Sequence, residues 1–292
     1  MKSLPAEAEE YLGSLRSERG LSRNTVGAYR RDLLDYFSFL DESEGQGTVA
    51  GFAEDLTRRG LARSTRARKL AAVRGYHRFL VVEGLSEDDP TILVDVPRRS
   101  RTLPKALTVE RVFRLLEAPD RSTPLGIRDA AILEFLYSTG ARVSEAATLG
   151  LTDLDLESGT VVVTGKGSKQ RLVPLGSHAR SAIQKYLPIR LELLSEEERR
   201  DVLFVNARGR GLTRQGIWEI VKRNGRLAGI DPASLSPHVL RHSAATHMVE
   251  GGADLRTVQE ILGHASISTT QIYTRVSPQH LYEVFVTSHP RS

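Results

Sequence analysis

Residues 238–273 read HVLRHSAATHMVEGGADLRTVQEILGHASISTTQIY, and this stretch decides how the second half of the chain is expected to fold. A helix is predicted over residues 237–248, because a proline suits its first turn and the glycine pair 251–252 provides a C-terminal stop. His238 and Arg241 are three positions apart in this helix, so their side chains share one face.

A second helix and a third, weaker one are predicted to follow. The second begins after Asp254, a suitable N-cap, and ends at Gly263, with apolar residues at helical spacing between them. His264 then lies just past the glycine, at an exposed corner. The β-branched residues before Tyr273 predict a short, weak and mobile helix, which suits a residue that moves into and out of a site.

The composition is that of an ordinary soluble globular protein. The 292 residues are 40% hydrophobic and 26% charged, which leaves room for two domains with cores of their own. No apolar run approaches the length of a membrane span, and the first residues lack the pattern of a secretory signal, so we expect a cytoplasmic protein without a membrane partner. The absence of cysteine excludes disulfides, thiolate nucleophiles and cysteine-ligated metal sites.

Basic residues are concentrated in one stretch of the first third of the chain. Lysine and arginine exceed aspartate and glutamate by 41 to 36, a balance compatible with a nucleic-acid partner. Every charged residue in 58–78 is basic, whereas a solvated helix surface usually mixes the two signs. This stretch is therefore predicted to face DNA phosphates. Its candidate DNA-contacting residues are Arg63, Arg66, Arg68, Lys69 and Arg74.

Residues 1–97 are predicted to form a helical domain. One long helix with an apolar stripe is expected after a cap at Ser22, and another over residues 48–59. A third begins at a cap on Ser64, and the segment 5–18 completes a four-helix core.

A basic, proline-bounded linker over residues 98–106 is predicted to separate this domain from a second one over residues 107–292. The second domain is expected to be helical apart from one hairpin, in which residues 161–163 and 171–175 pair across a turn. Trp218, on a later helix, is assigned to packing. The predicted fold class is thus mainly α with a small β-sheet.

For several further basic residues the sequence leaves two alternatives. Each either binds a phosphate or is simply exposed to solvent. Lys166 is at the hairpin tip between two glycines, followed by Lys169 and Arg171, which are also candidate DNA contacts. Arg142 lies where one helix ends and another begins. It is either an ordinary exposed residue or a phosphate clamp held by Glu145.

A metal site is the first alternative for the histidines. His238 and His242 are four apart, like half of a helical zinc site, but the HExxH pattern is missing and no carboxylate follows at the spacing of a third ligand. We therefore predict no metal and no other cofactor.

Attack by Tyr273 on a phosphodiester accounts for the whole set. A tyrosine with an ordinary pKa is only about 0.1% ionised at neutral pH, so roughly 4 kcal/mol must be offset by a base and by cations. Arg142 and Arg241 can fork onto non-bridging phosphate oxygens. His238 can act as the base that takes the tyrosyl proton, and Lys166 as the acid that protonates the leaving 5′ oxygen. His264 can add a hydrogen bond to the phosphate. Covalent attachment preserves the bond energy, so the reaction requires neither ATP nor a metal.

With these residues in place, the chain resembles the tyrosine recombinases (phage integrase family), and in particular the Xer subfamily, over essentially its whole length. The matching motifs are GARVSE at 140–145, GKGSKQRLVPL at 165–175, LRH at 240–242, GGADLRTVQEILGHASISTTQIYT at 251–274 and HPR at 289–291. The family's catalytic set matches Arg142, Lys166, His238, Arg241, His264 and Tyr273. Alanine at positions 141, 146 and 244 replaces bulkier residues that are common in the family, which concerns packing rather than the reaction.

The resemblance implies a clamp on duplex DNA. Residues 1–97 would be a helical, SAM-like core-binding domain and residues 107–292 a mixed α/β catalytic domain. Two protomer types, XerC and XerD, usually act as a tetramer on an inverted repeat called dif. They resolve chromosome dimers through 3′-phosphotyrosyl intermediates and a Holliday junction. The FVNARGRGLTRQ segment at 204–215 and the GGAD run favour the XerD type, with a XerC-type paralogue as its partner.

The resemblance also implies contacts made by the C-terminal segment. Residues 278–292 would pack on a neighbouring subunit, and an FtsK-type translocase would contact this end of the chain. Three rival functions stay open at this point: a mobile-element integrase with the same chemistry, a non-catalytic DNA-binding protein, and a type IB topoisomerase.

Overall fold

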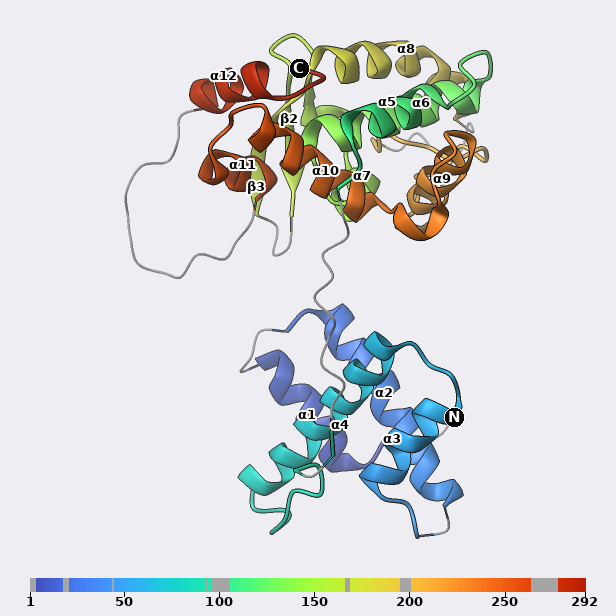
Figure 1. Ribbon diagram of the computed structural model, residues 1–292, viewed down its shortest axis with the longest axis vertical. Helices are drawn as coiled ribbons and strands as arrows, with labels where there is room; N and C mark the ends of the chain where they lie inside the picture. The colour runs from blue at the N-terminus through green and yellow to red at the C-terminus, as the bar shows by residue number, and fades with distance from the viewer. Residues whose placement is uncertain are drawn as a thin grey trace. The chain divides into compact units, whose positions relative to one another are not determined.

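The structure is a computed structural model, and it describes residues 4–17, 21–43, 45–92, 94–95, 106–165, 169–194, 201–263 and 278–292. The chain divides into two compact units, residues 1–102 and 103–292 (Figure 1). The linker predicted over residues 98–106 lies outside the described residues except for Ala106, so the predicted domain limits stay predictions. Within the described ranges, no helix is both long and apolar enough to cross a membrane.

Within the described residues of the N-terminal unit, four helices pack around one core. Their bounds are Ala6–Ser17 for α1, Arg23–Glu42 for α2, Val49–Arg58 for α3 and Arg63–Val82 for α4. Ser22 caps α2 and Thr48 caps α3, each by accepting a backbone N–H of the first turn. The helical fold and the Ser22 cap are confirmed. The Ser64 cap is wrong, because α4 begins earlier and Ala62 holds its N-cap position without a side-chain hydrogen bond.

In the part of the C-terminal unit that the structure describes, the chain is helical apart from one small sheet. Its α-helices are α5 Val109–Glu117, α6 Pro124–Thr139, α7 Val143–Thr148, α8 Ser177–Leu193, α9 Arg214–Leu227, α10 Pro237–Glu250, α11 Leu255–Leu262 and α12 Pro278–Ser288. Short 3-10 turns cover Leu151–Asp153 and Pro232–Ser234. Helices α10 and α11 confirm the first two helices predicted from the 238–273 stretch. The third, before Tyr273, lies outside the described residues.

Three antiparallel strands form the sheet in the order β1, β2, β3. They are β1 Leu154–Asp155, β2 Thr160–Thr164 and β3 Gln170–Pro174. Val162 pairs with Leu172 and Thr164 with Gln170, so the predicted hairpin is confirmed. Strand β1 was not predicted, because two residues are too few for an alternating pattern to show.

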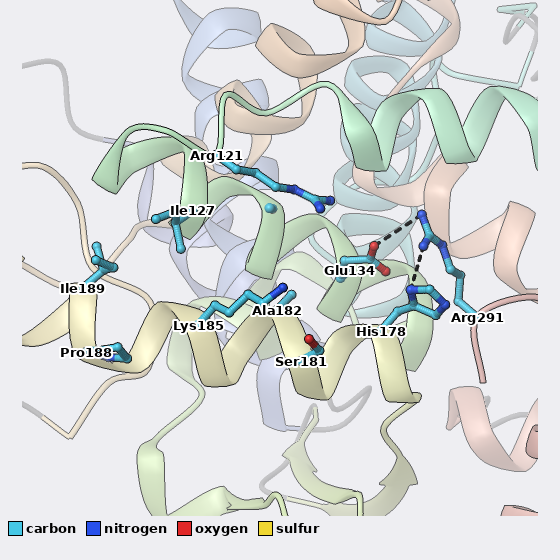
Figure 2. Close-up of a pocket in the computed structure, with 11 residues that line it drawn as sticks. Arg121, Ile127, Glu134, His178, Ser181, Ala182, Lys185, Pro188, Ile189 and Arg291 are labelled. Atoms are coloured by element: carbon cyan, nitrogen blue, oxygen red, sulfur yellow. Dashed lines mark hydrogen bonds and ion pairs between the residues drawn. The ribbon is translucent and has the colours of Figure 1, made fainter.

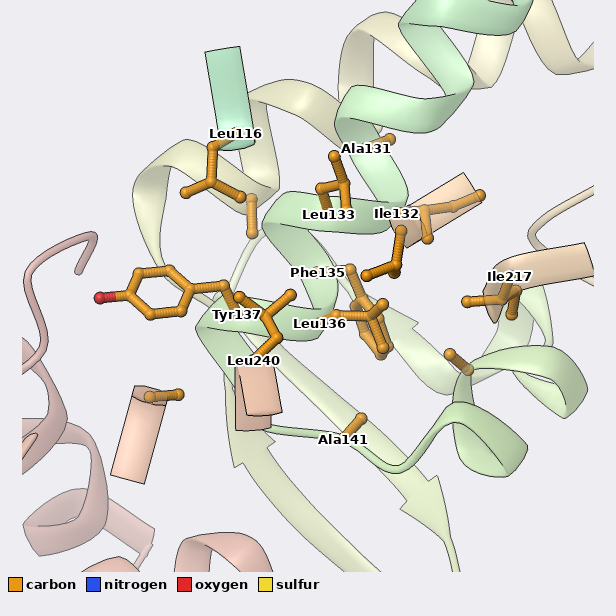
Figure 3. Packing of buried hydrophobic residues seen from close by; sticks show 14 of the residues in the cluster. Leu116, Ala131, Ile132, Leu133, Phe135, Leu136, Tyr137, Ala141, Ile217 and Leu240 are labelled. Atoms are coloured by element: carbon orange, nitrogen blue, oxygen red, sulfur yellow. The ribbon is translucent and has the colours of Figure 1, made fainter. Parts of the chain in front are cut away.

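Helix α6 lies inside the C-terminal unit and is buried from residue 128 to residue 139. Most of its residues are apolar, as expected for a buried helix, although Arg128, Asp129 and Glu134 are buried with them. Figure 3 shows it surrounded by side chains from other helices, among them Leu116, Ile217 and Leu240. Because the helix is enclosed, its end at Gly140 is a fixed point, and Arg142 follows two residues later.

The C-terminal helix α12 packs against α10, α11 and β3 of its own chain. Phe285 is fully buried, and His289 stacks on it while its Nε2 donates to the carbonyl of Tyr137 at 3.3 Å. The packing of residues 278–292 on a neighbouring subunit stays a prediction.

Candidate active site

Two arginines from different segments of the chain meet at the C-terminal end of α11. Arg142 precedes α7, and its Nη2 donates to the carbonyl of Gly263 at 3.1 Å. Arg241, in the second turn of α10, donates from Nη2 to the carbonyl of Leu262 at 2.6 Å and from Nη1 to the carbonyl of Gly140. The two guanidinium groups therefore bind the carbonyls of adjacent residues.

A third arginine contacts the same helix end. Arg171, on β3, donates from Nε to the carbonyl of Ile261 at 3.0 Å. The last carbonyls of a helix lack partners within it and carry the negative end of its dipole, so cations are favoured there. The three arginines thus hold the end of α11, from which the chain continues toward His264 and Tyr273.

Glu145 joins two of these arginines. Its Oε1 accepts from Nη1 of Arg142 at 2.8 Å and from Nη1 of Arg171 at 2.9 Å. Its Oε2 accepts from Nη2 of Arg171 at 2.9 Å and from the backbone N–H of Arg142 at 2.8 Å. Burial alone would raise the pKa of Glu145, but the hydrogen bonds from Arg171 and Arg142 outweigh it and lower the pKa to about 2. Of the two alternatives for Arg142, the structure shows the contact with Glu145, and its role as a phosphate clamp stays a prediction.

The site carries an excess of positive charge, since three guanidinium groups surround one carboxylate. Burial, and next the charges of Arg142 and Arg171, lower the pKa of Arg241 to about 10, so it is still protonated at neutral pH. The side chain of Arg142 is 37% exposed, whereas Arg241 is 8% exposed, so an anion arriving from solvent meets Arg142 first. Such a group of forked donors can bind a phosphate and stabilise charge that develops on it.

Two glycines permit this close approach. Gly140 and Gly263 end α6 and α11 in the left-handed region, with φ of 56° and 67°. A Cβ atom on Gly140 would lie 2.4 Å from Cδ2 of Leu262, and one on Gly263 would lie 2.8 Å from Cδ of Arg171. Only glycine meets both the conformational and the steric requirement.

Three of the six predicted catalytic residues lie in the described part of the chain: Arg142, His238 and Arg241. His238 is exposed in the first turn of α10, one turn before Arg241. Lys166, His264 and Tyr273 lie outside the described residues. Among the residues that are described, no group of three or more His, Asp or Glu side chains is arranged to hold a metal ion.

The end of the β2–β3 hairpin at Gly165, where the two strands are connected, lies beside Arg142. The Gly165 N–H donates to the carbonyl of Lys169 at 2.8 Å. A Cβ atom on Gly165 would lie 3.4 Å from Oε1 of Glu145 and 3.9 Å from Nη1 of Arg142. The residue that precedes Lys166 is therefore a neighbour of the arginine cluster.

Two of the basic residues predicted to face DNA are paired inside the N-terminal unit. Arg68 forms an ion pair with Asp32, and Lys69 lies 3.3 Å from Asp32 and 2.9 Å from Asp35. Both aspartates belong to α2, far from the basic stretch in sequence. A stretch without local acidic residues can therefore still be neutralised by another helix.

The other basic residues predicted to contact DNA differ in how far they are exposed to solvent. Arg74 donates to the carbonyls of Thr91 and Val94 at 3.1 and 2.6 Å, and Arg66 donates to Oγ1 of Thr57 at 2.6 Å. Arg63, at the start of α4, is exposed, and so is Lys169 at the hairpin. The last two are the predicted DNA contacts with the most solvent access.

Arg171 was predicted as a DNA contact, and its place beside Glu145 was missed. The alternation of side chains along β3 could have predicted that Arg171 points inward. Arg171 and the fully buried Val173 are two positions apart, so they share one face of the sheet. The opposite face carries the exposed Leu172.

Trp218 was assigned to packing, and this is wrong, because its side chain is 40% exposed. Nζ of Lys222, one turn further along α9, lies 4.5 Å from the centre of its ring. Trp218 lines a cleft of about 490 Å³ that also includes Val143, the neighbour of Arg142. The other lining residues are Thr213, Arg214 and Gln215. The four-residue spacing of Trp218 and Lys222 on a polar helix could have predicted this contact between the ammonium group and the ring.

Comparison with known proteins identifies the family. The phage integrase family model matches residues 105–280, and the model of the phage integrase N-terminal SAM-like domain matches residues 8–84. A tyrosine recombinase XerD of Mycobacterium tuberculosis is 46% identical over an alignment that covers 100% of both chains. Another XerD, of Listeria monocytogenes serotype 4b, is 43% identical over 97% of this chain and 98% of the relative.

Solved structures share the architecture. The XerH site-specific recombinase bound to palindromic difH substrate, in a post-cleavage complex, is 26% identical with a TM-score of 0.70, covering 89% of this chain and 78% of that one. A lambda integrase bound to a core site is 17% identical with a TM-score of 0.68 over 94% of this chain and 100% of that one, which shows the fold alone. The predicted fold class and the resemblance to XerD are confirmed. The chain belongs to the phage integrase family, the tyrosine recombinases.

Proposed function

We propose that the protein is a site-specific recombinase that cuts and rejoins duplex DNA through a 3′-phosphotyrosyl intermediate on Tyr273. One observation carries this proposal. The guanidinium groups of Arg142, just before α7, and Arg241, in α10, meet at the carbonyls of Leu262 and Gly263. The segment that contains His264 and Tyr273 begins at that point in the sequence. The arginines proposed to bind the phosphate therefore also hold the helix end from which the segment with the proposed nucleophile starts.

Each catalytic residue has a defined part in the proposed transfer. Arg142 and Arg241 fork onto the non-bridging oxygens of the scissile phosphate. The Tyr273 oxygen attacks phosphorus and forms the phosphotyrosyl bond, while the bond to the 5′ oxygen breaks. The proton movements and the remaining hydrogen bond belong to His238 as base, Lys166 as acid and His264 as donor to the phosphate. No energy source is consumed, because one phosphodiester replaces another.

We assign the DNA clamp to both halves of the chain. Residues 1–97 form the core-binding domain, 98–106 the linker and 107–292 the catalytic domain. The exposed Arg63 and Lys169 are placed toward phosphates, and the cleft beside Trp218 adjoins the Arg142 end of the site. Arg171 instead acts inside the protein, where it holds Glu145.

The relatives support a proposal for the biological reaction. Similarity to XerD proteins and to a XerH bound to difH supports a dif-like inverted repeat as the substrate. We propose a tetramer on DNA with a XerC-type paralogue, activation by an FtsK-type translocase, and resolution of chromosome dimers in the cytoplasm during segregation.

A nicked suicide substrate tests the chemistry. With a nick next to the cleavage point, the released fragment diffuses away and the wild type accumulates a covalent adduct that denaturing gels resolve. Tyr273→Phe is expected to bind the same duplex but to form no adduct. Adduct formed by the Phe variant would disprove the assignment of the nucleophile, whereas a wild type that forms no adduct would leave a DNA-binding role only.

A second arm separates chromosome dimer resolution from a mobile-element integrase. Recombination between two copies of a dif-like repeat is measured with this chain alone and with a XerC-type partner added. Adducts on nicked DNA without recombination of the paired repeats would favour a different target or a topoisomerase.

A further inference from the structure

A separate cavity lies between α6, α8 and the C-terminal residues, and none of the candidate active-site residues lines it (Figure 2). Its volume is about 670 Å³, which is within the range of small-molecule pockets. One end is apolar and is formed by Ile127, Pro188 and Ile189. The other end is polar and is formed by Glu134, His178 and Arg291.

Positive charge predominates around this cavity. Arg121 reaches over it from the loop before α6, Lys185 rises from α8, and Arg291 enters from the C-terminal segment. Glu134 is the one carboxylate among the described residues that line it. Burial, and next the charges of Arg291 and Arg121, lower the pKa of His178, which keeps that imidazole neutral. The charges therefore favour an anionic ligand.

The polar end contains hydrogen-bonding atoms that no described residue satisfies. Glu134 is 3% exposed, and its Oε2 has no hydrogen-bond partner among the described residues. The same holds for Nε and Nη2 of Arg291. A buried polar atom without a partner costs roughly 1 to 3 kcal/mol, so native proteins rarely keep one without a use.

A purely structural role for the pair does not account for this arrangement. Arg291 is fixed by other contacts, since Nη1 donates to Nδ1 of His178 at 2.8 Å and Cζ lies 4.6 Å from the ring centre of Phe113. Nη2 of Arg291 is 3.5 Å from Oε1 of Glu134, which is ion-pair range but too long for a good hydrogen bond. A carboxylate present only to hold this arginine would be expected to close that distance.

We propose that this cavity binds a small organic anion with an apolar body and an N–H or O–H donor next to its acid group. The apolar body lies against Ile127 and Ile189. The acid group lies between Arg121 and Lys185, and the donor reaches the carboxylate of Glu134. Concavity and the separation into an apolar and a polar end favour a small ligand over a flat protein contact.

The fluorescent probe anilinonaphthalene sulfonate has these three features, since it carries a sulfonate beside a secondary amine on an aromatic body. Fluorescence titration of the full chain is expected to give saturable binding at one site. Lys185→Glu is expected to weaken that binding about tenfold through loss and reversal of one ion pair. Arg226→Glu is the matched control, because it makes the same charge change at an exposed arginine of α9 and is expected to leave binding unchanged.

Two further comparisons make the proposal specific. Ala182→Phe, which fills the cavity from α8, is expected to abolish saturable binding. The N-methyl analogue of the probe lacks the donor, so it is expected to bind wild type more weakly than the parent, and this difference is expected to vanish in Glu134→Leu. Circular dichroism melts verify that each variant is folded, because the probe also brightens on partly unfolded protein.

Equal affinities of Lys185→Glu and Arg226→Glu would overturn the proposal, since the probe would then bind elsewhere on the surface. Cavity-dependent binding of an acidic peptide, with no binding of the probe, would replace it with a protein partner.

Discussion

Arg171 and Glu145 form a two-pronged ion pair inside the catalytic unit, with Nη1 to Oε1 and Nη2 to Oε2 both at 2.9 Å. The same carboxylate also holds Arg142, one of the two proposed phosphate ligands. The position of the proposed phosphate clamp is therefore set by a carboxylate that is not itself one of the proposed phosphate ligands.

Glu145→Gln is expected to destabilise the protein and to slow cleavage. The substitution places an NH₂ group against the guanidinium donors of Arg171 and Arg142, and breaking a buried ion pair costs about 3 kcal/mol or more. Urea unfolding measures the loss of stability, and the nicked substrate measures the rate of adduct formation. Glu157→Gln, at an exposed position, is the control, and equal stability of the two variants would refute the role given to Glu145.

Arg171→Lys separates an internal role from a DNA contact. Lysine keeps the charge but cannot form the two-pronged pair with Glu145, so adduct formation is expected to fall while the salt dependence of DNA binding stays unchanged. Lys169→Ala is expected to show the opposite pattern. The salt dependence of its DNA binding becomes shallower, whereas adduct formation and the melting temperature stay unchanged. A shallower slope for Arg171→Lys would restore the sequence-based reading of Arg171 as a DNA contact.

The basic residues of the N-terminal stretch are likewise expected to fall into two groups, those that contact DNA and those that stabilise the fold. Arg63→Ala is expected to reduce the slope of log affinity against log salt by about 1 without changing thermal stability, because Arg63 is exposed. Arg68→Ala is expected to lower the melting temperature, because it removes a partner of the buried Asp32. If Arg68→Ala instead melts like wild type and binds DNA with a reduced slope, its pairing with Asp32 is not important for the fold.

The sequence predicted those features that depend on local pattern. The cap at Ser22, the helix end at Gly263 and the hairpin around Gly165 are each specified within a few residues, and all three are confirmed. The resemblance to the family likewise rests on short motifs, which a single sequence displays in full.

Features that depend on partners distant in sequence were not predictable in this way. The basic stretch of α4 looks unpaired until α2 brings Asp32 and Asp35 against it. Arg171 looks like a surface residue until α7 supplies Glu145. In both cases tertiary packing places an expected phosphate ligand in an ion pair with another element of the fold, and charge counting along the chain does not register the pairing.

Acid is expected to loosen the C-terminal segment through His289. Burial lowers the pKa of His289 to about 4, with smaller contributions from His247 and Arg291. The unfolded chain, with an ordinary histidine pKa near 6.5, therefore binds a proton that the folded protein excludes. This contribution is present in full above about pH 6.5 and is lost as pH falls toward 4, amounting to about 3 kcal/mol.

Urea unfolding at pH 7 and pH 4.5 measures this effect. His289→Gln lacks the titrating group, so wild type is expected to lose more stability than the variant over this interval, and His247, whose pKa burial also lowers, is common to both. Parallel losses in the two proteins would show that His289 titrates normally in the folded state.

Gly263→Ala tests whether the end of α11 is held against Arg171. Gly263 and Gly229 have nearly the same left-handed φ, 67° and 69°, so alanine at either position costs about 1 to 2 kcal/mol in backbone strain. A Cβ atom at position 229 meets nothing within 4 Å, whereas at position 263 it would lie 2.8 Å from Cδ and 3.0 Å from Nε of Arg171. Gly263→Ala is therefore expected to cost more stability than Gly229→Ala, and to slow adduct formation because Arg171 must shift away from Glu145. Urea unfolding and the nicked substrate measure the two effects. Equal costs in both variants, with cleavage unaffected, would mean that only the backbone conformation at Gly263 matters and that the contact with Arg171 does not position the site.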